Sequence, residues 1–155
     1  MPKVIDSFEN EFAFLSNFHP SKICYEGIEY PTVEHAFQAA KTFDFEQRVA
    51  IAAAPTPGKA KRMGRSVSLR PDWEEVKNSI MEELVRRKFQ DKHLALLLWS
   101  TGEKELIEGN WWNDTYWGVC KGVGRNQLGK TLMKIREEIK IKQYLISELE
   151  KDLKL

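Results

Sequence analysis

The sequence has few of the side chains that metal or disulfide chemistry needs. Its 155 residues include three histidines and two cysteines, Cys24 and Cys120, and none of these residues cluster at the spacing of a metal site. We therefore expect no metal and no other cofactor. Two isolated cysteines are expected to be buried free thiols rather than a disulfide.

Long apolar runs are also missing. No stretch approaches the roughly 20 apolar residues that a membrane-spanning helix requires, and the first residues lack the core of a signal peptide. A protein of the cytoplasm, without a membrane partner, is the expectation. The net charge is only +1, so any attraction for phosphate must come from a local group of cations.

The remaining pattern is that of one small, mostly helical α+β protein. Its length suits one compact domain, which we place at residues 1–141, followed by a helical extension at 142–155. Two short β-branched or aromatic runs flank Glu26-Gly27 and predict a β-hairpin. Around it, capping residues and apolar periodicity predict helices at 33–43, 45–54, 57–64, 71–91 and 93–99, with a short strand at 105–109.

The helix predicted at 33–43 has a polar row suited to a site. Glu34, Gln38 and Lys41 are spaced i, i+4 and i+7, so their side chains lie along one stripe. Such a row is also typical of a solvated face. Because Glu34 is near the helix N-terminus, where the dipole favours an anion, we expect an ionised carboxylate there.

A basic segment follows between Val49 and Pro71, where no acidic residue occurs. Arg62 and Arg65 are three residues apart, and their guanidinium groups are suited to holding a phosphate. The alternative is that these cations complement a helix C-terminus.

An aromatic loop at 110–118 has polar side chains between its rings. Trp117 offers a flat face for a planar base, and Asn113 and Asp114 lie beside it in the sequence. We expect Asp114 to donate a proton to a departing base, and we expect Trp111 or Trp112 to pack in the core.

Two further asparagines are candidates for substrate contact. Asn17 lies between Ser16 and Phe18, where a turn residue is the alternative. Asn126 lies in a glycine-rich stretch that fails the G-x-G-x-x-G dinucleotide pattern, because Gln127 takes the place of the third glycine.

The C-terminal segment shows a heptad-like apolar repeat interrupted by Lys142. We expect its first half to pack on the body and residues 142–155 to extend as a helix that self-associates. The repeat consists of Leu128, Leu132, Ile135, Ile139, Ile146, Leu149 and Leu153.

Six segments, in this order, resemble the NADAR (YbiA-like) family. They are FLSNF (14–18), YPTVEHAFQAAK (30–41), AKRMGR (60–65), NDTYWG (113–118), GRNQLG (124–129) and LMKIRE (132–137). The resemblance covers about residues 8–140. It implies a compact, mostly helical α+β fold and N-glycosidase activity.

The resemblance also implies roles for individual residues. Glu34 matches the catalytic glutamate and Lys41 a lysine of the site. Asp114 and Trp117 match the acidic and aromatic positions, while Arg62 and Arg65 match the basic segment.

Some members of the family hydrolyse the bond between ribose phosphate and base in early riboflavin-pathway intermediates, and others remove ADP-ribose from modified guanine. The sequence leaves both substrates open, including a nucleic acid as substrate. Two other classes also remain, a nucleic-acid-binding module without chemistry and an interaction protein that works through its C-terminal helix.

Overall fold

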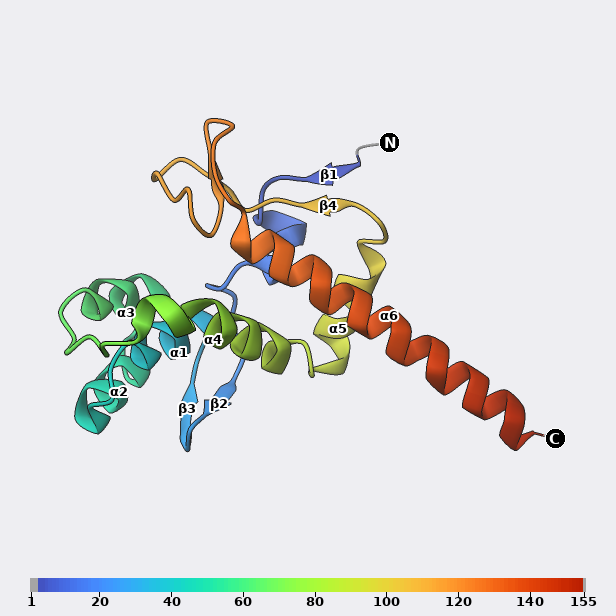
Figure 1. The fold of residues 1–155 in the computed structure, drawn as a ribbon, viewed down its shortest axis with the longest axis horizontal. Coiled ribbons are helices and arrows are strands. Elements are labelled where there is room, and N and C mark those ends of the chain that lie inside the picture. The colour runs from blue at the N-terminus through green and yellow to red at the C-terminus, as the bar shows by residue number, and fades with distance from the viewer. Residues whose placement is uncertain (1–2, 155) are drawn as a thin grey trace. The chain divides into compact units, whose positions relative to one another are not determined.

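The computed structural model describes residues 3–154, which divide into two compact units. Glu9–Gln90 form one unit, and residues 3–8 with residues 91–154 form the other. Figure 1 shows the helices and short strands of both. The expected class, a mostly helical α+β protein with small sheets and a long C-terminal helix, is confirmed.

The unit of residues 9–90 is built around one buried helix, α1 (Val33–Ala40). It packs against α2, α3 and α4, and all eight of its residues are buried, including Glu34 and Gln38. The other elements of the unit are the 3-10 helix η1 (Asn10–Leu15), the strands β2 (Ile23–Tyr25) and β3 (Ile28–Tyr30), and the helices α2 (Phe45–Ala52), α3 (Pro57–Gly64) and α4 (Trp73–Lys88).

The expected hairpin is confirmed, because β2 and β3 pair antiparallel with Ile23 opposite Tyr30. Glu26 and Gly27 form its turn with φ angles of 47° and 84°, the left-handed region that glycine adopts without cost. The hairpin leads directly into α1.

Side-chain caps fix the starts of the first three α-helices. Thr32, Asp44 and Thr56 each accept a hydrogen bond from the backbone N–H three residues later. The helix ends differ more from expectation, because α1 stops at Ala40 rather than at Phe43. The Phe43 ring is 63% exposed and lies under the guanidinium of Arg70.

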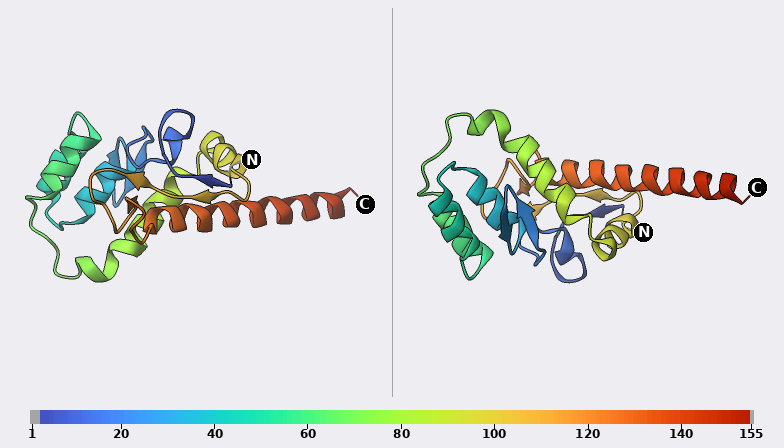
Figure 2. Two further views of the ribbon diagram at one scale, coloured as in Figure 1. Left: turned by 90° about the horizontal axis from the view of Figure 1, so that it is seen from above. Right: turned by 90° about the horizontal axis from the view of Figure 1, so that it is seen from below.

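The other unit contains two short parallel strand pairs and two helices. The pairs are β1 (Val4–Ile5) with β4 (Glu105–Leu106), and β5 (Gly109–Asn110) with β6 (Val119–Cys120). The single strand expected at 105–109 is thus divided between two sheets. The helices are α5 (Lys92–Ser100) and α6 (Gln127–Leu153), and α6 runs without interruption in both views of Figure 2.

The first half of α6 packs on α5 and β4, as expected, and buries Leu128, Leu132 and Ile135. Two expectations about side chains are wrong. Trp111 and Trp112 are 82% and 44% exposed, so neither is a core residue. Both thiols are free, but Cys24 is exposed and only Cys120 is buried.

Candidate functional site

The polar row of α1 lies in a buried environment. Glu34 is 8% exposed and Gln38 is 4% exposed, and the Gln38 Nε2 donates a hydrogen bond to Glu34 Oε1 at 2.8 Å. The carboxylate is therefore held in one orientation by a neighbour one helical turn away. A solvated face, the alternative that the sequence allowed, does not fit this burial.

A glycine of α3 makes room for this pair. A Cβ atom placed on Gly64 would lie 1.9 Å from Gln38 Oε1 and 2.8 Å from its Cδ, so α3 approaches α1 too closely for any side chain at that position. Gln38 Oε1 is itself buried without a hydrogen-bond partner among residues 3–154. Gly64 thus positions Gln38, and through it Glu34.

Lys41 follows the last residue of α1. Burial lowers the pKa of its ammonium group, the carboxylate of Glu34 opposes that shift, and the positive charges of Arg65, Lys61 and Lys77 lower the pKa further. A lower pKa leaves more of the amine neutral and nucleophilic. The charges of Glu34 and Arg65 thus both act on the Lys41 ammonium group.

The Trp73 ring lies beside this lysine, and the Phe37 ring packs against Trp73. Lys41 Nζ is 5.9 Å from the centroid of the Trp73 ring, and the ring centroids of Phe37 and Trp73 are 5.0 Å apart. The sequence analysis predicts a helix at 71–91 and gives the Trp73 ring no role in the site. Its periodicity on α4 gave no indication of the contact, because the partners come from another helix.

Asn17 is placed against the first turn of α1. Its backbone carbonyl accepts a hydrogen bond from the N–H of Glu34 at 3.1 Å, and its Nδ2 donates to the sulfur of Met81 at 3.5 Å. The preceding carbonyl, of Ser16, accepts from Lys88 Nζ at 2.8 Å. Substrate contact stays a prediction for Asn17, and the structure adds Lys88, which the sequence analysis missed.

Asp114 organises its own loop in the other unit. Its Oδ1 accepts hydrogen bonds from the N–H groups of Tyr116 and Trp117 at 3.1 and 2.9 Å, an Asx-type turn. The side chain of Asn110 holds both backbone groups of Asp114. The proton-donor role of Asp114 stays a prediction, and fixing the backbone of Trp117 is the role that the contacts demonstrate.

Other predicted residues of this loop region also make structural contacts. Asn113 has a φ angle of 65° and accepts from the thiol of Cys120, and the Trp117 ring stands edge-on to Tyr116. Asn126 is buried, and its amide binds the backbone of Leu106 and Glu108. Both polar ends of that amide are therefore occupied by backbone groups. A contact of Asn126 with substrate stays a prediction.

Arg62 lies within α3, whereas Arg65 is the residue at its C-terminal cap. Arg65 contributes to the charge around Lys41, whereas Arg62 lines a pocket between α2 and α3. The idea that the two arginines hold one phosphate together stays a prediction that these surroundings do not favour.

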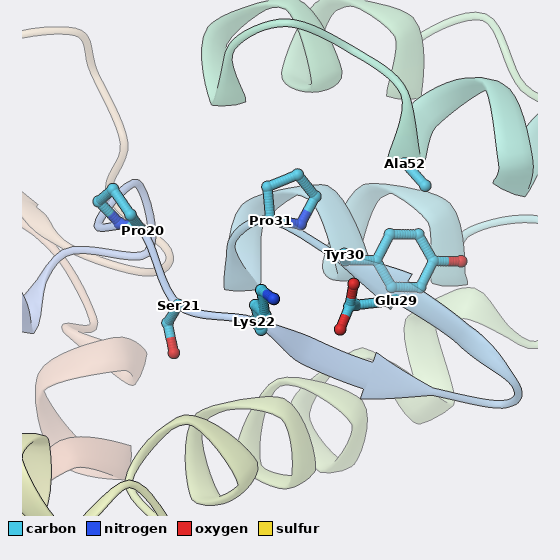
Figure 3. Close-up of a pocket in the computed structure, with 7 residues that line it drawn as sticks. All are labelled: Pro20, Ser21, Lys22, Glu29, Tyr30, Pro31 and Ala52. Carbon is cyan, nitrogen blue, oxygen red and sulfur yellow. The ribbon is translucent and has the colours of Figure 1, made fainter.

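Figure 3 shows a second pocket of the same unit, with a volume of about 510 Å³, beside the β-hairpin. Its two charged residues are Lys22 and Glu29, which have opposite signs, and none of the predicted site residues lines it. We assign no function to this pocket.

Two classes of feature are not found among residues 3–154. No group of three or more His, Cys, Asp or Glu side chains is placed to hold a metal ion. None of the helices in the same range combines the length and hydropathy needed to span a membrane.

The chain is similar to known proteins over most of its length. The chain is 40% identical to the N-glycosidase YbiA of Escherichia coli (strain K12) over 141 residues, which is 88% of each protein. It is 36% identical to a riboflavin biosynthesis protein of Vibrio vulnificus over 135 residues, 84% of this chain and 36% of that protein.

The fold is shared as well. The NMR structure of E. coli YbiA superimposes with a TM-score of 0.81 at 38% sequence identity, covering 93% of this chain and 89% of that one. The model of the NADAR domain matches residues 5–140, a range that includes every candidate residue above. The chain therefore belongs to the NADAR domain family.

Proposed function

We propose that this NADAR-family N-glycosidase hydrolyses the bond between a phosphorylated ribose and a nitrogen base. The names of its relatives, an N-glycosidase and a riboflavin biosynthesis protein, support this reaction class. The observation on which the proposal depends is the buried Glu34 carboxylate, fixed by Gln38 and near a lysine whose pKa is lowered.

Cleavage of an N-glycosidic bond develops positive charge on the sugar and negative charge on the departing base. A fixed carboxylate in a buried site stabilises the first charge or orients the attacking water. We assign this role to Glu34. We assign Arg65 to the phosphate, because its guanidinium has no hydrogen-bond or ion-pair partner among residues 3–154.

The departing base needs a proton and a stacking surface. We assign stacking to Trp117 and assistance to the leaving group to Asp114, as the resemblance to the family implies. Variants of this loop test the assignment separately from Glu34: Trp117→Ala is expected to raise KM more than it lowers kcat, since stacking holds the base before and during cleavage.

Lys41 offers a second route through the same site. Its neutral amine can attack C1 and form a new C1–N bond while the bond from C1 to the base breaks, and the base leaves with the proton that the amine loses. Ring opening turns this adduct into an imine, which water hydrolyses to the free sugar and the amine. Borohydride would reduce such an imine to a stable adduct visible as added mass on the protein. An adduct that is absent in Lys41→Ala supports the imine route, and no adduct in the native protein rejects it.

The direct test is release of free base, followed by mass spectrometry. The purified protein is incubated with a ribose-phosphate pyrimidine intermediate and, separately, with ADP-ribosylated guanine. We expect base from one class, and a loss of at least about 100-fold in Glu34→Gln, as for removal of a general base or electrostatic stabiliser.

A matched control is Glu29→Gln, the same chemical change at an exposed residue of β3. It should leave turnover unchanged. Near-normal turnover in Glu34→Gln would reject the proposed role. Strong, salt-sensitive binding of nucleic acid without release of any base would instead support a binding module.

A further inference from the structure

A pocket between α2 and α3 has the chemistry of an anion site. Its volume is about 410 Å³, and it belongs wholly to the unit of residues 9–90. The residues that line it are Gln47, Ala50, Ile51, Lys59, Arg62, Met63, Ser66 and Val67.

The cations of α3 and of its C-terminal cap have two different surroundings. Lys61 and Arg65 are four residues apart and act on Lys41, near Glu34. Lys59, Arg62 and Ser66 instead line the pocket. The pocket is therefore distinct from the surroundings of Lys41.

The cations of the pocket lack the carboxylate partners that neighbouring arginines have. In the described part of this unit, Arg48, Arg70, Arg86 and Arg87 each form an ion pair with a nearby Glu or Asp. Arg62 and Lys59 have no side-chain hydrogen bond or ion pair within residues 3–154, and no acidic residue occurs from position 50 to 70.

The remaining walls define what kind of anion fits. The hydroxyl of Ser66 adds a neutral donor, whereas the side chain of Gln47 is already bound to Thr42 and Ser68. Ile51, Met63 and Val67 supply an apolar floor. Guanidinium, ammonium and hydroxyl donors together match the several acceptor oxygens of a phosphate group.

We propose that this pocket binds a phosphate group, at a place separate from the substrate phosphate proposed beside Glu34. The phosphate would belong to a nucleotide or to the backbone of a nucleic-acid strand. The base or sugar of that ligand would lie over the apolar floor of the pocket. The inference concerns binding only and does not depend on the proposed hydrolysis.

The test is a titration of the ¹⁵N-labelled full chain with inorganic phosphate, followed by amide resonances in NMR spectra. Saturable shifts are expected at Lys59, Arg62 and Ser66, with none when chloride is added at the same ionic strength. Arg62→Gln and Lys59→Gln should each weaken binding at least about fivefold, since each removes a charge-assisted contact.

Lys92→Gln is the matched control, because Lys92 is exposed on α5 in the other unit. It should bind as the native protein does. Shifts that never saturate, or that persist unchanged in both Arg62→Gln and Lys59→Gln, would overturn the proposal. Because Arg62 and Lys59 are exposed, loss of folding is not expected to confuse the result.

Two further titrations identify the source of the phosphate. A nucleoside monophosphate that shifts the same amides and also those of the apolar floor identifies a nucleotide site. A short single strand that binds more tightly than the monophosphate, with an affinity that falls steeply with salt, identifies a strand-binding site. If neither ligand competes with inorganic phosphate for these residues, the proposal fails.

Discussion

Lys88 is a buried lysine without a carboxylate partner in the described structure. It is 1% exposed, and burial lowers the pKa of its amine from the ordinary value of 10.5 to about 7. Its Nζ donates to the carbonyl of Ser16, next to the residue whose own carbonyl binds the N–H of Glu34. The lysine thus supports the segment that borders the site.

This burial makes stability depend on pH. In the unfolded chain the amine keeps its proton up to about pH 10.5, but in the folded protein it does so only up to about pH 7. Between these values the unfolded state binds more protons, so the free energy of unfolding rises with pH, by at most about 1.4 kcal/mol per pH unit.

Urea unfolding at several pH values in this range measures the slope. Lys88→Met removes the titrating group and keeps an unbranched chain, so its slope should be flatter than that of the native protein. Equal slopes in the two proteins would show that Lys88 does not titrate in this window.

At the scale of single residues, spacing was enough to predict that Glu34 and Gln38 lie side by side on a helix, with Glu34 in its first turn. It was not enough for Trp73 or Lys88. Their partners, Lys41 and Ser16, come from other elements, so no local pattern contains these contacts. The prediction that Trp111 or Trp112 packs in the core was wrong, because composition does not say which side chains of a loop face the solvent.

At the scale of elements, the contact between α1 and α3 gives a prediction. Gly64→Ala places a methyl group against the Gln38 amide, which is buried and already bound to Glu34. Either the hydrogen bond breaks or the helices separate. We expect a loss of about 1–3 kcal/mol in the free energy of unfolding, as for overpacking, and slower base release.

Gly58→Ala is the control within the same helix. The nearest atom to its added Cβ is Thr56 Oγ1 at 3.9 Å, so there is room for the methyl group. Because alanine restricts the unfolded chain, this variant should gain about 0.5–1 kcal/mol. If both substitutions change stability equally, close packing at Gly64 is not what matters.

Among the elements, the starts of helices could be predicted from the sequence, whereas the pairing of the short parallel strands could not. Thr32, Asp44 and Thr56 marked helix starts correctly, because a cap is a contact between residues three apart. The parallel pairs β1 with β4 and β5 with β6 were not predicted, since strands of two residues carry no period and their partners are distant in sequence.

At the scale of the molecule, α6 extends past the part of the chain that matches the NADAR model, which ends at residue 140. Arg136 donates to the hydroxyl of Thr101 and Lys140 to the carbonyl of Gly102, and these contacts hold α6 to its unit. Beyond them lies an exposed apolar row with a spacing of four, formed by Ile141, Leu145, Leu149 and Leu153.

A helical end of this length is marginal in water unless its apolar side is covered. We propose that a second copy covers it, because packing against the same row of a partner helix removes this apolar area from water. Truncation after Lys142 keeps the contacts of Arg136 and Lys140, and it should lower the mass per particle in light scattering from that of a dimer to that of a monomer.

The exposed row itself is tested by Leu145→Asn with Leu149→Asn, which keeps the helix length but removes apolar area from the dimer contact. We expect monomers. The matched control, Gln143→Ala with Ser147→Ala, changes the opposite side of the same two turns and should leave the dimer intact. A native chain that is already monomeric at high concentration, or a dimer that survives both the truncation and the asparagine pair, would mean that α6 does not join two copies.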